Sequence, residues 1–136
     1  MGGVTVAATT GALVAMGHRA GSAGLPFASI GALVLHRTVT DGAVGLVFAG
    51  LVLHALAMFA WSYAFVWVVE HAVHRDILAG VLVAASQFVL SGVATSATGQ
   101  GIASILPLGD RIVFAAILAA SLVVGIRLAF PRGQHV

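Results

Sequence analysis

The charged residues of this chain stand almost entirely between long apolar stretches. Its 136 residues include six arginines, four acidic residues and no lysine, and 60 % are hydrophobic against 7 % charged. A soluble domain has about 25 % charged residues. Only in lipid can whole helices be apolar on every face, since a helix satisfies its own backbone hydrogen bonds there. The pattern predicts an all-α, polytopic integral membrane protein with a single domain.

Four apolar stretches are expected to form a four-helix transmembrane bundle, at about 2–17, 42–69, 77–98 and 112–130. The first covers about 24 Å and the second about 42 Å, against a hydrocarbon core of about 30 Å. The second stretch ends in Trp61, Tyr63 and Trp67, aromatic residues typical of a membrane–water interface. Two shorter apolar segments, about 25–36 and 99–109, are predicted to be interfacial or re-entrant connector helices. A fifth span at the first of them is the alternative.

The arginines leave the orientation in the membrane open, although we expect the membrane to be the bacterial inner membrane. With four spans, three arginines lie on each side, so the positive-inside count is a tie: Arg75, Arg127 and Arg132 against Arg19, Arg37 and Arg111. No positively charged region of a signal peptide precedes the first stretch, which is expected to stay as structure. The chain has no cysteine, which excludes disulfides and thiol catalysis.

A row of small residues follows one side of the first predicted span. Gly3, Ala7, Gly11 and Ala15 recur at every fourth position, with Thr5 and Thr9 in a neighbouring row. Such a ridge lets another backbone approach closely. We expect packing within the chain's own bundle, with a dimerisation or partner face as the alternative. Either interpretation predicts that the row is buried against protein.

A polar row marks one face of the third predicted span. Gln87, Ser91, Thr95 and Thr98 stand at intervals of four or three residues, which places them on one side of a helix. Polar groups in lipid turn inwards, because an unpaired amide in hydrocarbon costs several kcal/mol. The row predicts interhelical hydrogen bonds, or else a narrow water path or a small polar ligand site.

His54 stands near the middle of the second predicted span, with Met58 and Trp61 on the same face. An ionisable residue at that depth is a functional candidate by default. The first interpretation is a neutral imidazole hydrogen-bonded to the row that includes Gln87. The alternatives are a proton relay, a ligand contact, or axial ligation of haem b. A bis-histidine haem would need a second chain, since no other predicted span contains a histidine.

The segment Glu70 to Asp76 gathers polar residues between two predicted spans. Glu70, His71 and His74 are weak candidates for a metal site, because two histidines three residues apart can share one helix face. The HExxH pattern of zinc hydrolases is absent. We expect no metal here, but a solvated turn with a Glu70–His74 pair. Asp41 and Asp110 each precede a span and are predicted to cap its positive end.

These features predict a protein without enzymatic activity and without a cofactor. No predicted span has an acidic residue in its interior, and no nucleophile–base set shares one depth. The expected function is an accessory or structural subunit that packs against a larger membrane complex, respiratory or photosynthetic. Its partners are the lipid bilayer and other subunits or further copies of the chain, not nucleic acid. The alternatives are a homo-oligomeric channel or transporter using His54, Gln87, Ser91 and Thr95, or a haem b-binding electron carrier.

Overall fold

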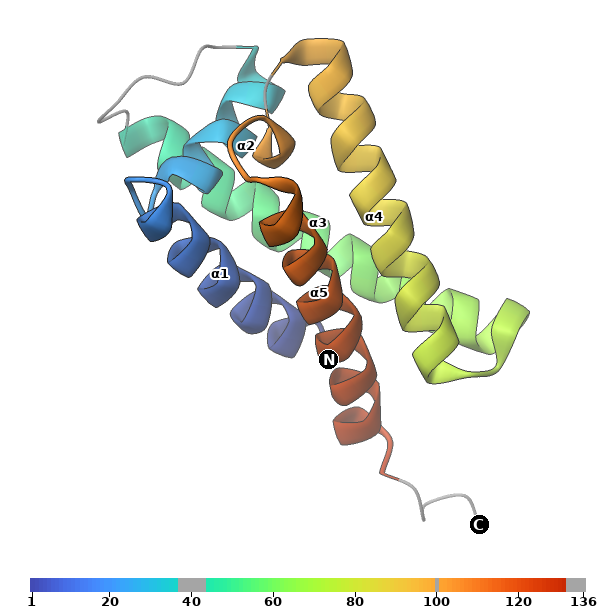
Figure 1. Ribbon diagram of the computed structural model, residues 1–136. Coiled ribbons are helices and arrows are strands. Elements are labelled where there is room, and N and C mark those ends of the chain that lie inside the picture. The colour runs from blue at the N-terminus through green and yellow to red at the C-terminus, as the bar shows by residue number, and fades with distance from the viewer. Residues whose placement is uncertain (37–43, 100, 132–136) are drawn as a thin grey trace.

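The computed structural model describes residues 1–36, 44–99 and 101–131, and every regular element in them is a helix (Figure 1). The elements in chain order are α1 (Gly2–Arg19), α2 (Leu25–Leu35), α3 (Val44–Val68), the π-helix η1 (Val69–Val73), α4 (Asp76–Thr98), the 3-10 helix η2 (Ile102–Ser104) and α5 (Leu108–Ala129). The all-α prediction is confirmed for these residues.

Three of the helices are long and apolar enough to cross a membrane: α3 together with η1, then α4 and α5. They coincide with the predicted spans 42–69, 77–98 and 112–130, although the helix that begins at Val44 runs on to Val73. The first predicted span, 2–17, forms α1 but is not one of the three. The fourth span therefore stays a prediction.

Large apolar side chains cover the outside of these helices. On α3 alone, Phe48 is 68 % exposed, Leu56 60 % and Tyr63 76 %. Isolated apolar residues are normal on a soluble surface, but contiguous apolar faces are not. The three long helices are therefore compatible with a membrane location.

The interior is built from one row of α3 and the facing rows of its neighbours. The row on α3 repeats every fourth or third residue and is buried throughout: Leu46, Gly50, His54, Met58, Ser62 and Phe65. The largest fully buried apolar side chains come from α1, α3 and α5: Leu13, Phe65, Phe114, Leu118 and Leu122. His54 and Ser62 are the two polar side chains in this buried row of α3.

The helix α2 contacts α3 through glycine. A Cβ placed on Gly50 would overlap the backbone carbonyl of Phe27, and one on Gly31 would overlap the carbonyl oxygen of Leu46. Only residues without a side chain allow two backbones to approach this closely. Most of α2 is buried, so this predicted connector is packed into the bundle rather than laid on its surface.

The second predicted connector helix, 99–109, is wrong in detail. Before α5 begins at Leu108, only the single turn Ile102–Ser104 is helical in the described part of that segment. Gly99 and Gly101 have φ values of +71° and +105°, which break a right-handed helix. Pro107 then forms the N-cap of α5.

The small-residue row of α1 does not pack within the bundle, so that interpretation is wrong. Gly3, Ala7, Gly11 and Ala15 are all exposed, whereas the neighbouring row is buried: Thr5, Thr9, Leu13 and Met16. Larger side chains bury more apolar area, which favours turning their row inwards. The small-residue row remains free for contacts outside the chain.

Ion pairs join the helices near both ends of the bundle. Arg19 of α1 bonds Asp110 of α5 at 2.9 Å, and Asp76 of α4 bonds Arg127 of α5 at 2.6 Å. Asp110 lies in the first turn of α5, at the positive end of the helix as predicted, but its carboxylate bonds Arg19 and no side chain caps that helix. The predicted cap at Asp41 lies outside the described residues.

Candidate functional site

A cavity of about 140 Å³ lies inside the bundle where α3 and α4 face each other. Five of the six predicted site residues line it: His54, Met58 and Trp61 from α3, with Gln87 and Ser91 from α4. The remaining wall is apolar and comes from α1, α2, η2 and α5, with further residues of α3 and α4: Leu13, Ile30, Leu33, Ala57, Ala94, Gly101, Ile102 and Phe114. Thr95 is half-buried near Gly101 and is not part of the lining.

Helix periodicity explains this convergence. His54, Met58 and Trp61 are four and three residues apart, and Gln87 and Ser91 are four apart, so each set occupies one helix face. The two faces are turned towards each other. Sequence spacing therefore identified which side chains share a face, and the fold brings the two faces together.

His54 is 3 % exposed and its imidazole Nε2 lies 3.0 Å from Oγ1 of Thr9. Oγ1 of Thr9 also lies 2.7 Å from the carbonyl oxygen of Thr5. The hydroxyl has one hydrogen, so it either donates to Thr5 and accepts from a ring protonated at Nε2, or donates to Nε2 of a ring protonated at Nδ1. The predicted partner, the row of Gln87, is thus replaced by a threonine of α1.

Gln87 is 8 % exposed and lines the cavity, and no hydrogen bond joins its amide to another residue that the structure describes. In the described part of the chain, the side-chain atoms that are both fully buried and without a partner are Thr5 Oγ1 and Arg111 Nε, so the amide of Gln87 stays accessible from the cavity. The hydroxyl of Ser91 donates to the carbonyl of Phe88 at 2.9 Å, which leaves the lone pairs of its oxygen as acceptors. The cavity therefore offers an unused amide and a hydroxyl oxygen to whatever occupies it.

One end of the cavity is closed by contacts between the two connectors. The hydroxyl of Ser29 in α2 donates to the carbonyl of Gly101 at 2.6 Å and accepts from its backbone N–H at 3.0 Å. Ser104 donates to the same carbonyl. Sequence reasoning did not identify Ser29, because one serine in an apolar segment gives no signal of a partner 72 residues away.

The size and lining of the cavity limit what it can hold. An apolar cavity of about 150 Å³ binds benzene or xenon, whereas drug-sized ligands need about 300–1,000 Å³. No charged side chain is found among the described lining residues. The haem b hypothesis finds no support here, because the space is too small for the macrocycle and Nε2 of His54 is bonded to Thr9.

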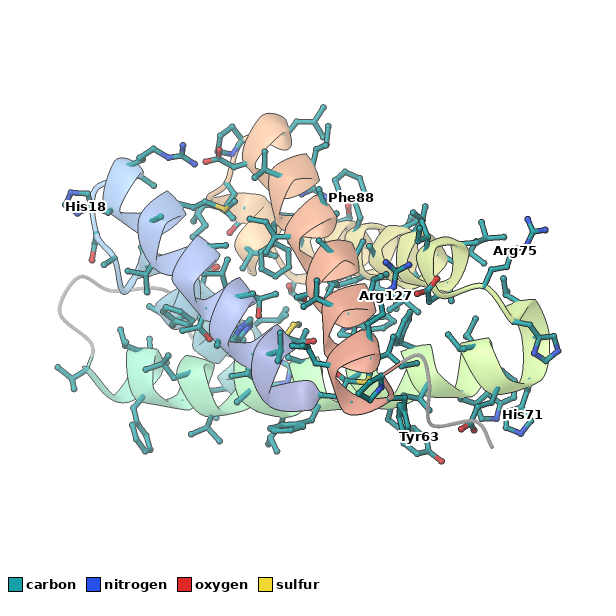
Figure 2. All side chains as sticks on the ribbon, turned by 90° about the horizontal axis from the view of Figure 1, so that it is seen from below. His18, Tyr63, His71, Arg75, Phe88 and Arg127 are labelled. Atoms are coloured by element: carbon teal, nitrogen blue, oxygen red, sulfur yellow. The ribbon has the colours of Figure 1, made fainter. Side chains whose placement is uncertain are left out.

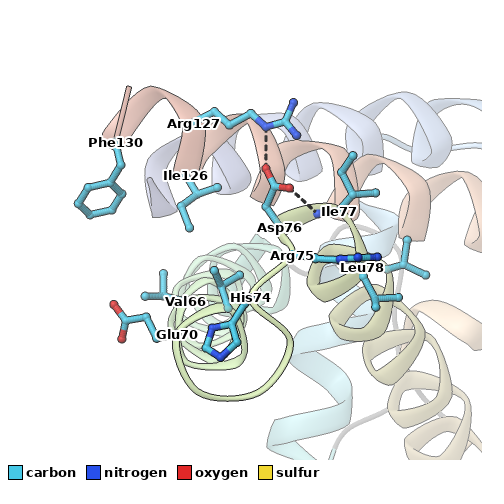
Figure 3. Close-up of a pocket in the computed structure, with 12 residues that line it drawn as sticks. Val66, Glu70, His74, Arg75, Asp76, Ile77, Leu78, Ile126, Arg127 and Phe130 are labelled. Carbon is cyan, nitrogen blue, oxygen red and sulfur yellow. Dashed lines mark hydrogen bonds and ion pairs between the residues drawn. The ribbon is translucent and has the colours of Figure 1, made fainter. Parts of the chain in front are cut away.

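The polar segment after α3 forms a separate groove with the ends of α4 and α5 (Figure 3). Glu70 and His74 point in different directions there and form no pair, contrary to the prediction. The ring of His71 stacks on Trp67, with 5.2 Å between the ring centroids. Within the described ranges, no three His, Asp or Glu side chains are grouped as metal ligands would be.

Comparison with known proteins assigns no relative. No protein-family model, curated protein or solved structure matches this chain. The cavity and the fold are therefore the guides to function.

Proposed function

We propose that the chain is an integral membrane protein in which α3, α4 and α5 span the bilayer and α1 forms a fourth span. Their apolar outer faces support this placement. Polar side chains also gather at the two ends of the molecule, with His18 at one end and His71 and Arg75 at the other (Figure 2). That distribution suits a slab of hydrocarbon between two aqueous surfaces.

Within the membrane, we propose that the protein binds a small uncharged molecule in the cavity between α3 and α4. The observation that carries this proposal is the amide of Gln87, which stands in the cavity wall, accessible from the cavity and without a hydrogen bond to another described residue. Hydrocarbon offers no hydrogen bonds, so an unused amide at this place is costly unless a ligand or water meets it. Pockets with an apolar wall and a few convergent polar groups are the usual form of ligand sites.

The ligand class follows from the lining. The molecule is compact, about the size of a single aromatic ring, and carries a group that hydrogen-bonds the amide of Gln87 or the hydroxyl oxygen of Ser91. Ala57 lies at the rim and is exposed, so the cavity opens to the side of the bundle. A lipid-soluble molecule can enter there directly from the bilayer.

The inward direction of the polar row favours this function over a pore. A homo-oligomeric channel would place the row of Gln87 and Ser91 on a surface between subunits. Both residues line a cavity inside one chain instead. A binding site within each subunit accounts for that placement without a second copy.

Fluorine NMR with a matched pair of probes tests the proposal. The protein is placed in lipid nanodiscs and titrated with 4-fluorophenol and with fluorobenzene, which lacks the hydroxyl. Empty nanodiscs give the contribution of partition into lipid. We expect one saturable site for 4-fluorophenol and an about tenfold weaker affinity for fluorobenzene, as a loss of about 1.4 kcal/mol would produce.

Two variants assign the probe to the cavity. Gln87→Leu removes the amide and should abolish the preference for 4-fluorophenol. Ser86→Ala is the matched control, because Ser86 is the exposed neighbour on α4 and bonds only the carbonyl of Leu82 among the described residues. Uptake of 4-fluorophenol no greater than in empty nanodiscs would contradict the proposal.

A second candidate is the accessory subunit of a larger membrane complex, favoured by the exposed small-residue row of α1. A Cβ added at Gly3 or Gly11 would meet no atom within 4 Å, so another helix has room to approach. Gly11→Leu should then remove a partner that co-purifies in fixed stoichiometry. Gly45→Leu is the control, because Gly45 on α3 is equally open. This variant should still co-purify with the partner. A monomer with no partner in either variant or the wild type would contradict this role.

A further inference from the structure

An apolar groove of about 510 Å³ runs along the outer surface between α4 and α5. Five alanines form most of its floor and walls: Ala84, Ala85, Ala115, Ala116 and Ala119. Phe88 lines it as well and is labelled in Figure 2. From Ile112 to Ala119 the lining extends for about 10 Å along α5, against about 15 Å for half of a hydrocarbon core. The groove therefore covers about two thirds of the depth of one leaflet.

Arg111 lies beside one end of this groove, in the first turn of α5. Its guanidinium carbon is 4.5 Å from the centre of the Phe88 ring. Its Nη2 would lie 3.2 Å from a Cβ on Gly92, so the glycine makes room for the guanidinium against α4. The Nε atom is buried and has no hydrogen-bond partner within the described residues.

Among the residues that the structure describes, no carboxylate pairs with Arg111. The adjacent Asp110 bonds Arg19, and Asp76 bonds Arg127 at the other end of α5. A guanidinium that is half-buried, held by an aromatic ring and still short of an acceptor is suited to a polyatomic anion. Arginine binds phosphate through two parallel hydrogen bonds, which lysine cannot do.

We propose that this groove binds an anionic glycerophospholipid, with one acyl chain between α4 and α5 and the headgroup phosphate on Arg111. The inference rests on the proposed membrane location but not on the proposed cavity ligand. Charge complementarity selects the occupant, because an apolar helix of a second copy would fill the groove without supplying the anion. A phospholipid supplies the apolar chain and the anion in one molecule.

Native mass spectrometry of the intact chain tests this inference. The protein is reconstituted in nanodiscs with equal amounts of phosphatidylglycerol and phosphatidylcholine that carry the same acyl chains. On release, we expect one retained phosphatidylglycerol per chain, favoured about tenfold over phosphatidylcholine, as one charged hydrogen-bonding contact would give. Failure to enter nanodiscs at all would count against the membrane location rather than against lipid selectivity.

Four variants locate the retained lipid. Arg111→Gln should lower retention of phosphatidylglycerol to that of phosphatidylcholine, and Arg111→Lys should give an intermediate value. Ala116→Leu should fill the groove and reduce retention of both lipids. Arg75→Gln is the control, because Arg75 is an exposed arginine at the opposite end of α4.

Three outcomes would overturn the inference. The first is equal retention of the two lipids by the wild type, and the second is equal behaviour of Arg111→Gln and Arg75→Gln. The third is a wild-type dimer that retains no lipid and that dissociates in the Ala116→Leu variant but not in the other variants. That result would mean that a second copy of the chain fills the groove. Circular dichroism of each variant confirms that the helices are intact before its lipids are counted.

Discussion

The helix α3 meets α2 and α4 in opposite ways. Against α2, Gly50 touches the backbone of Phe27 so closely that no side-chain atom fits between the two helices. Against α4, His54, Met58 and Trp61 surround a cavity of about 140 Å³. Gly50, which makes the close contact, and His54, which lines the cavity, are only four residues apart in the same buried row of α3.

The size of the side chains explains this difference. Glycines remove every atom that would separate α2 from α3, and close backbone contact stabilises helix pairs in lipid through van der Waals packing. On the side of α4, the side chains of His54, Met58 and Trp61 line a cavity instead. The tight contact fixes the position of α3, and the cavity lies on its other side.

The largest effect is expected where the packing is tightest. Gly50→Ala places a methyl group on the carbonyl of Phe27, and relief requires a shift of α2. We expect a loss of about 3 kcal/mol or more, the upper part of the range for overpacked cores. Thermal unfolding in detergent measures the change.

Gly45→Ala is the matched control on the same helix, since nothing lies within 4 Å of its added Cβ. Alanine has the higher helix propensity by about 1 kcal/mol, so this variant should be neutral or more stable. Equal melting temperatures for the two variants would mean that α2 and α3 are not in backbone contact.

A smaller loss of stability is expected where a hydrogen bond, rather than close packing, joins two helices. Thr9→Val removes the hydroxyl that bonds Nε2 of His54 without changing the shape of the side chain. Hydrogen bonds between membrane helices average about 0.6 kcal/mol and reach about 1.7 kcal/mol, and a histidine left unpaired favours the upper value. We therefore expect a loss of about 1.5 kcal/mol in thermal unfolding.

Thr5→Val provides the comparison, because the hydroxyl of Thr5 is buried without a partner in the described structure. Removing it should be neutral or stabilising. If Thr5→Val is as harmful as Thr9→Val, the bond to His54 does not account for the loss.

The smallest effect is expected on the open side of α3. Ala94→Leu adds three carbons to a residue of the cavity wall, and filling a cavity commonly adds about 0.5–2 kcal/mol. We expect stability that is unchanged or raised by about 1 kcal/mol, together with loss of the saturable 4-fluorophenol site. A destabilised Ala94→Leu that still binds the probe would show that the space lies elsewhere.

Sequence reasoning predicted where the long helices lie, because charges, glycines and prolines separate the apolar stretches. It missed two limits by four residues: the helix that begins at Val44 runs on to Val73, and α5 begins at Leu108. It also identified the inward face of α4, since a glutamine in an apolar helix has to avoid hydrocarbon. The facing of α1 could not be predicted in the same way. Its small residues and its threonines form adjacent rows of similar polarity, and both rows suit close packing.

The partners of the polar groups were beyond prediction as well. His54 bonds Thr9, 45 residues away, and Asp110 bonds Arg19, 91 residues away. Helical spacing specifies which residues share a face, but not how each helix is rotated against its neighbours. The cavity itself depends on those rotations, so the sequence predicted five residues of its lining but not the space between them.

The most direct test is the stability of Gln87→Leu measured with and without 4-fluorophenol. In the empty protein the unpartnered amide is a cost, so the variant should unfold at a higher temperature than the wild type, by about 1 kcal/mol in stability. The probe should then stabilise the wild type and leave the variant nearly unchanged. A variant that is less stable than the wild type when empty, and that responds equally to the probe, would make Gln87 a structural residue and contradict the binding site.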